Sequence, residues 1–101
     1  MNIIYKNDYG FNIPFVMAFT LVDATDVKLS IHRPDGTTVN RTLASGDYAG
    51  VGLNDTLEVA TIDGDFDVAG YCYAQIHVTK AGVEILSDKV LFAVKNKNTF
   101  T

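Results

Sequence analysis

The residues of this chain that could do chemistry are a cluster of aspartates, two histidines and a single cysteine. One short segment places three carboxylates at alternate positions, Asp63, Asp65 and Asp67. Several carboxylates on one turn suit Ca²⁺, but a complete calcium loop also needs a glutamate at its twelfth position, which is missing here. We therefore interpret the segment as a solvated turn with one Asp capping the corner, and we expect no metal ion.

The histidines and the cysteine also lack the partners that catalysis or metal binding needs. His32 and His77 share the parity of polar neighbours in alternating segments, so both are expected to face outward, and a zinc site needs further ligands. Cys72 cannot form an intrachain disulfide, because it is the only cysteine, and its parity with Ala74 and Ile76 predicts a core position. No serine or cysteine stands in a motif that supplies a base and an orienting group. We therefore expect no enzyme and no cofactor.

Composition favours one acidic domain. The chain has 101 residues, a net charge of −4 and a pI near 4.8, and 48% of its residues are hydrophobic. Its cations are scattered, which argues against nucleic acid, whose phosphates attract clustered Lys and Arg. The longest apolar stretch, Ile13 to Val22, is too short to span a membrane, and residues 1–8 lack the pattern of a secretion signal. We therefore expect neither nucleic acid nor a membrane as a partner.

Polar and apolar residues alternate over most of the chain, which is the pattern of half-buried strands. Residues 2–6 suit a short edge strand. Between 11 and 20 every second residue is aromatic or a large aliphatic residue, and Pro14 predicts a sheet edge or a strand switch, because it cannot donate to a ladder. Residues 27–32 alternate equally cleanly and predict an antiparallel strand with one buried face.

A turn with a clear mechanism follows at Arg33–Thr37. Pro34 presets φ for the first corner, Asp35 can accept hydrogen bonds from its own backbone, and Gly36 tolerates positive φ. This turn predicts a hairpin whose second arm begins at Thr38.

The end of the chain predicts a second hairpin, formed by Tyr71–Thr79 and Val83–Lys95. The apolar parity of the second arm switches around 86–88, which indicates a bulge or kink, because one extra residue exchanges the two faces. Tyr71 follows the Asp67 corner, as in a tyrosine corner whose hydroxyl bonds to the backbone of the preceding turn. Both residues are therefore expected to have structural roles.

These elements add up to an all-β fold. Residues 44–52 read as a Gly-rich loop, and 53–62 favour a strand over a helical turn because β-branched residues are frequent there. About seven short strands, with no convincing helix, predict an immunoglobulin-like antiparallel β-sandwich over residues 1–96. Residues 97–101 read as a polar tail.

Three segments carry a resemblance to a known family. The hairpin Asp26–Val39 resembles the V-x-L-x-I-x-x-P-D-G-T hairpin of immunoglobulin-like domains in tailed-phage virion proteins. The segment Gly70–Ile76 resembles the Gly-led, Tyr-containing strand of those domains, and Ser87–Lys95 resembles their last strand. Over Thr20–Asn96 the chain is similar to the N-terminal domain of phage baseplate upper proteins.

The resemblance implies a structural protein that docks onto other virion proteins in a tail, baseplate or fibre, within a homo-oligomer or another symmetric assembly. It implies a place in the virion, after assembly in the host cytoplasm, and it offers no catalytic residues. Those proteins usually continue into a long helical or fibrous segment, which this sequence does not include, so a capsid decoration protein is the alternative within the same class.

We expect apolar residues near the two ends of the chain to contact a partner, because they have no evident role in an isolated monomer. Protein contacts are expected at six positions: Ile3, Ile4, Tyr5, Tyr48, Lys97 and Phe100. The alternative for the terminal residues is that they complete the core of the sandwich.

A glycan is the expected ligand under a hypothesis of a different class. The chain has five tyrosines, and exposed tyrosines beside Asn and Asp can stack on sugars. A carbohydrate-binding or host-adhesion module would use the tyrosines near Tyr48 and Tyr9, on one patch at the loop end of the sandwich.

Overall fold

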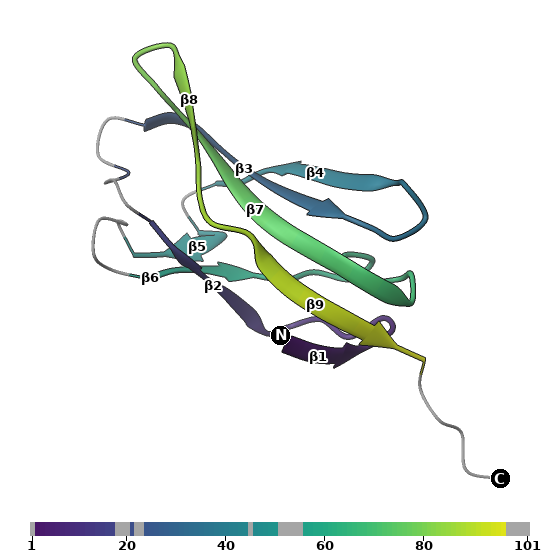
Figure 1. The fold of residues 1–101 in the computed structure, drawn as a ribbon. Coiled ribbons are helices and arrows are strands. Elements are labelled where there is room, and N and C mark those ends of the chain that lie inside the picture. The colour runs from purple at the N-terminus through teal and green to yellow at the C-terminus, as the bar shows by residue number, and fades with distance from the viewer. Residues whose placement is uncertain (1, 18–20, 22–23, 45, 51–55, 97–101) are drawn as a thin grey trace, which may run out of the picture.

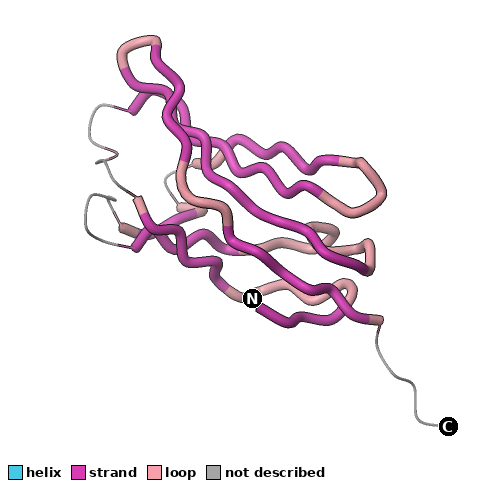
Figure 2. Tube along the Cα trace, viewed as in Figure 1, coloured by secondary structure: helices cyan, strands magenta, loops and turns pink. Residues whose placement is uncertain are grey.

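The computed structural model describes residues 2–17, 21, 24–44, 46–50 and 56–96. Within them the chain forms two sheets of β-strands and no helix (Figures 1 and 2). The strands are β1 (Asn2–Tyr5), β2 (Asn12–Val16), β3 (Ala24–His32), β4 (Thr38–Thr42), β5 (Tyr48–Ala49), β6 (Thr56–Ala60), β7 (Gly70–Lys80), β8 (Val83–Leu86) and β9 (Val90–Lys95).

The larger, six-stranded sheet has the order β1-β9-β7-β3-β4, and β8 pairs with β7 along the edge that β9 also occupies. Its pairs are antiparallel except for β1 and β9, which run parallel. The three-stranded sheet has the antiparallel order β2-β6-β5. Figure 1 shows the two sheets lying over one another as two layers. The expected short edge strand at residues 2–6 is therefore confirmed.

Alternating side chains from both layers fill the space between the sheets, as the sequence predicts. Pro14 lies on β2, at an edge of the three-stranded sheet, where a missing amide donor is tolerated. The buried hydrophobic side chains include Ile13, Phe15 and Met17 near β2, Val27, Leu29 and Ile31 on β3, Leu57 and Val59 on β6, and Cys72, Ala74, Ile76 and Val78 on β7. Phe19 lies outside the described residues.

Aromatic rings add a second group to this core. Phe66 packs 5.8 Å from Phe11 and 4.9 Å from Phe92, measured between ring centroids. These three residues come from the turn before β2, the turn before β7 and the centre of β9, so they join distant parts of the chain. Separations of this size are favourable for aromatic pairs.

The sheets differ from the expected seven strands in two places. A two-residue strand, β5, forms inside the segment that reads as a loop, and it pairs Tyr48 with Val59. The second arm of the last hairpin is divided into β8 and β9. At the division the Ser87 amide donates to the Ile76 carbonyl, and the Ser87 hydroxyl accepts from the Ile76 amide, both at 2.9 Å. The predicted change of face around 86–88 is confirmed.

The turn between β3 and β4 has the chemistry that its sequence predicts. Gly36 has a φ of +89°, and the Asp35 carboxylate accepts hydrogen bonds from the amide and hydroxyl of Thr37, at 2.9 and 2.6 Å. The hydroxyl bond is the main reason that the pKa of Asp35 is lowered. Pro34 packs against Gly70, where a Cβ would lie 2.7 Å from the proline ring. The turn therefore fixes the start of β7 as well as its own hairpin.

Two arginines close one side of the sandwich. Arg41 faces inward, because it pairs with Leu29, and its guanidinium reaches Asp65 at 2.5 Å and the Ala60 carbonyl at 3.1 Å. Asp65 is only 2% exposed, so this ion pair is buried. Arg33 bonds to Asp67 at 3.1 Å. Asp67 thus ties the turn before β7 to the turn after β3 by an ion pair. The carboxylate that accepts a backbone amide in this turn is Asp65, which bonds to Ile62 at 2.9 Å and is buried, so the turn is not the solvated one that we expected.

Arg41→Ala is expected to lower the free energy of unfolding by about 3 kcal/mol, because it leaves the Asp65 carboxylate buried without its cation. Chemical denaturation measures this change. Lys28→Ala is the control: Lys28 and Asp26 form an exposed pair at 3.3 Å, and its loss should cost less than about 1 kcal/mol. Equal losses in the two variants would contradict the structural role of Arg41.

Candidate functional site

The outer face of the six-stranded sheet carries exposed apolar side chains from three neighbouring strands. Phe92 and Val94 face the core, so Leu91 and Ala93 of β9 face outward, and the pairing places Ile3 and Tyr71 on either side of Ala93. The exposed fractions are 73% for Tyr71, 61% for Ile3 and 50% for Leu91. Tyr5, 44% exposed, lies on the same face of β1. We call Ile3, Tyr5, Tyr71 and Leu91 the outer-face stripe.

Tyr71 does not form the expected tyrosine corner. Its ring lies on the outer face, and its hydroxyl makes no hydrogen bond within the described part of the chain. The reason is strand parity: Cys72 faces the core, so both of its neighbours on β7 must face away from it. The corner is held instead by the Arg33–Asp67 ion pair. Tyr71 is therefore available for contact rather than for support of the turn.

The stripe is bordered by an aromatic stack and by cations. His32 stacks on Tyr73 with ring centroids 4.4 Å apart, and the Lys89 ammonium lies 4.5 Å from the centre of the Tyr73 ring. Lys95 pairs with Tyr5 at the other end of the stripe. Such stacks hold flat side chains in fixed positions. The face therefore presents ordered aromatic surface beside lysines.

A serine, a histidine and a glutamate form a hydrogen-bonded row farther along the same face. Ser30 Oγ lies 2.9 Å from His77 Nε2, and His77 Nδ1 lies 3.3 Å from Glu84 Oε1. The residues come from β3, β7 and β8. The sequence does not reveal this row, because it depends on which residues of three strands lie level with one another. The order nucleophile, base and orienting carboxylate is that of a hydrolase triad.

The surroundings of Ser30 do not support nucleophilic catalysis. Its side chain is buried, with only 2% of the residue exposed, so a substrate carbonyl has no approach. β3 pairs on both sides, with β4 and β7, so the backbone amides near Ser30 are engaged in the ladders and none is free to hold an oxyanion. We interpret the row as a polar link that fixes the β7–β8 hairpin to β3.

Cys72 is buried at 6% exposure, which confirms the predicted core position. Burial raises the pKa of its thiol from 9.0 to about 11. The thiolate is the reactive form of cysteine, so burial and the raised pKa both lower the reactivity of this thiol.

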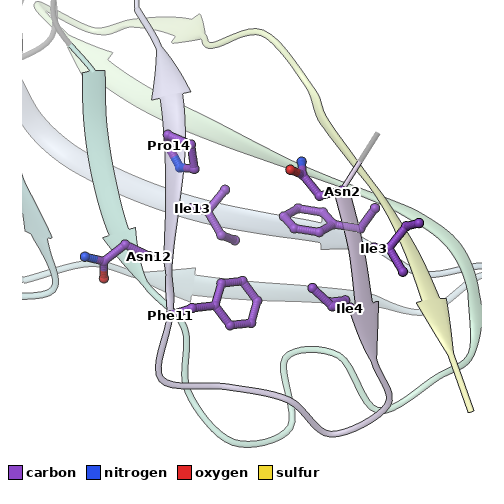
Figure 3. A pocket seen from close by; sticks show the side chains of 8 residues that line it. Asn2, Ile3, Ile4, Phe11, Asn12, Ile13 and Pro14 are labelled. Atoms are coloured by element: carbon purple, nitrogen blue, oxygen red, sulfur yellow. The ribbon is translucent and has the colours of Figure 1, made fainter. Parts of the chain in front are cut away.

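A small groove opens between β1 and β2 (Figure 3). Its volume is about 190 Å³, below the roughly 300 Å³ at which small-molecule pockets usually begin. Figure 3 shows Ile4, Phe11 and Ile13 directed into it. Ile4 is half-buried and packs against the core, so it completes the sandwich, whereas Ile3 and Tyr5 stay exposed as the contact hypothesis requires.

The structure separates the two tyrosines of the glycan hypothesis. Tyr48 pairs with Val59, which faces inward, so its ring packs against the core instead of forming a surface platform. Tyr9, in the turn between β1 and β2, is 59% exposed. The expected contact residues Lys97 and Phe100 lie outside the described residues.

Within the described residues, no group of three or more His, Cys, Asp or Glu side chains could hold a metal ion. His32 and His77 both lie on the outer face and are half-buried, and each contacts a neighbouring side chain. The described part of the chain also contains no helix that could span a membrane.

Ser30→Ala is expected to lower the free energy of unfolding by about 1 kcal/mol, the usual contribution of one hydrogen bond. The wild-type protein should give no adduct with a fluorophosphonate, because the Ser30 hydroxyl is buried. Denaturation and intact-mass spectrometry measure the two effects. A covalent adduct on Ser30 that Ser30→Ala abolishes would overturn the structural interpretation of the row.

Cys72 in the native protein is expected to react with iodoacetamide at pH 8 at least about 100-fold more slowly than in urea, because raising the thiol pKa from 9.0 to about 11 reduces the thiolate fraction by that factor. Mass spectrometry over time measures both rates. Comparable rates would show that the thiol is accessible in the folded protein.

Comparisons with protein-family models, with curated proteins and with solved structures found no match to this chain. Its function must therefore be argued from its own surface. The outer-face stripe is the candidate site that the geometry favours most.

Proposed function

We propose that this chain is a non-enzymatic, immunoglobulin-like β-sandwich that makes protein–protein contacts in the virion of a tailed phage. The contacts are made by the outer-face stripe. One observation is the main support for the proposal. Ile3 and Tyr71 pair with Ala93 from the two strands beside it, and both residues are more than half exposed.

The strand order supports the immunoglobulin-like part of the proposal. Immunoglobulin domains place their second, fifth and fourth strands in one sheet and their third, sixth and seventh strands in the other. Here β2, β6 and β5 form one sheet, and β3, β7 and β9 are neighbours in the other, with β4 added beside β3. On this assignment β8 is an extra strand, and β1 is a first strand that joins the larger sheet.

An exposed tyrosine on a rigid strand is a favourable contact residue. Tyr, Trp and Arg are enriched among the residues that contribute most to protein interfaces, because they cover a large area and lose little rotamer entropy. Tyr71 lies on β7 and pairs with Ala93 of β9, two residues beyond the His32–Tyr73 pair that ends the ladder with β3, so its backbone is fixed before a partner arrives. Apolar patches of this kind on a monomer commonly mark interaction sites.

The virion part of the proposal rests on the resemblance to baseplate upper proteins. The resembling segments form β3, β4, β7 and β9, the same strands that carry or support the outer face. A tail, baseplate or fibre is the proposed location, in contact with other virion proteins, and a capsid decoration protein is the alternative. In either location the protein acts by shape complementarity and holds its neighbours in register.

A shallow hollow on the three-stranded sheet favours the glycan alternative. It has a volume of about 200 Å³, and its lining includes Asn12, Asp47, Tyr48 and Glu58, which gives it amide and carboxylate groups suited to sugar hydroxyls. Tyr48 faces the core, however, so the hollow offers no aromatic ring from that residue. We therefore rank the protein-contact function first.

The double variant Tyr71→Ala, Leu91→Lys is expected to weaken binding to phage particles stripped of their minor proteins at least about 30-fold, the effect of losing an interface hot spot. Co-sedimentation of labelled protein with the particles measures the affinity. Val16→Lys is the matched control, because Val16 is 65% exposed on the other sheet and should not affect binding.

Saturable binding that the double variant leaves unchanged would contradict the assignment of the stripe. Failure of wild-type protein to bind particles, together with a glycan-array response that Tyr71→Ala does not affect, would support the glycan alternative. Circular dichroism of each variant establishes that it is folded.

A further inference from the structure

We propose that the partner of the outer face is a second copy of this chain, in a two-fold dimer whose six-stranded sheets pack face to face. This inference rests on the proposed function of the stripe as a contact surface. The two-fold axis crosses the strands at the level of Ala74, near the middle of β7.

The size of the face sets an upper limit on the area that a dimer can bury. At about 3.3 Å per residue and about 4.8 Å between strands, the strands of the larger sheet cover a face of about 600 Å². Each partner of a stable interface buries about 600 to 1,000 Å². Under an axis at Ala74, β7 and the edge formed by β8 and β9 meet their counterparts, whereas β1 with Ile3 and Tyr5 meets no strand of the partner. The dimer therefore buries less than the whole face and is expected to be weak.

The charges of the face are complementary to themselves under this axis. Glu84 pairs with Thr79 on β7, and Lys95 lies one position beyond the Gly70–Val94 pair, on the same edge of β7. Both therefore lie five positions from Ala74, in opposite directions. A two-fold axis at Ala74 brings Lys95 of one copy opposite Glu84 of its partner, at both ends of the interface.

The two-fold axis at Ala74 also brings apolar residues of the two copies together. Leu86, 48% exposed, pairs with His77, three positions from Ala74, and Ala93 pairs with Tyr71, three positions away in the other direction. Leu86 of one copy therefore meets Ala93 of its partner. Small beside large is the combination that lets two sheet faces pack closely.

The other charged groups on this face are compatible with the proposed face-to-face dimer. Lys28 is paired with Asp26 at 3.3 Å, and Lys89 lies over the Tyr73 ring. His77 is held between Ser30 and Glu84. The two lysines of β9 and its approach therefore meet no cation, because Lys95 faces Glu84, and Lys89, level with Gln75, faces the level of Leu91 in the partner.

The first experiment measures mass by light scattering and sedimentation of the full chain up to about 100 µM, a range that detects even weak dimers. Wild type and Val16→Lys are expected to give twice the monomer mass, and Leu91→Lys to give a monomer, because the new ammonium faces the Lys89 region of the partner. Monomeric wild-type protein over this range would overturn the proposal.

The second experiment exchanges the proposed ion pair. Lys95→Glu and Glu84→Lys should each raise the dimer dissociation constant about tenfold, and the double variant should restore it, because the pair is reversed at both ends of the interface. A dimer that responds equally to Val16→Lys and Leu91→Lys, or no rescue in the double variant, would refute this register. A monomer that still binds particles through Tyr71 and Leu91 would refute the second copy while leaving the contact function intact.

Discussion

The pairing of β3 with β7 determines where nearly every other part of this protein lies. β7 pairs with β3 on one edge and with β8 and β9 on the other, and β3 in turn holds β4. The register Leu29–Ile76 and Ile31–Ala74 places large and small core residues side by side. The same register brings Ser30 level with Gln75 and next to His77 on the opposite face. A shift by one residue would reverse both faces at once, since side chains alternate with a period of two.

That dependence explains which features could be predicted from the sequence. The β3–β4 turn, the edge position of Pro14, the buried Cys72 and the change of face at Ser87 all follow from local parity or from turn chemistry, and all are found in the structure. Arg41 and Ser30 could not be placed in the same way. Their contacts with Asp65 and His77 join strands that are distant along the chain, and these depend on lateral register that a single sequence does not specify.

Tyr71 and Tyr48 illustrate two different errors. For Tyr71, the resemblance to a tyrosine corner conflicted with parity, which already grouped this residue with the outward side chains of β7, and parity was correct. Tyr48 lies in a Gly-rich segment that reads as a loop. In the structure Tyr48 and Ala49 pair with β6, and this pairing turns the Tyr48 ring toward the core. Short strands of this kind are held by the neighbouring strand rather than by their own residues, so local propensity contains little information about them.

The break in strand pairing at Ser87 separates the β7–β8 hairpin from the sandwich, and this separation determines where the chain can accept insertions. Because the hydroxyl and amide of Ser87 bond to Ile76 at that point, the alignment of β9 is set again after the hairpin, independently of what precedes it. Residues added or removed near Ala81 and Gly82 would therefore leave the order of side chains on β9 intact. Tight turns with exposed tips tolerate insertions best. The hairpin is thus a place where foreign peptides or whole domains can be grafted while the two-sheet body stays as it is.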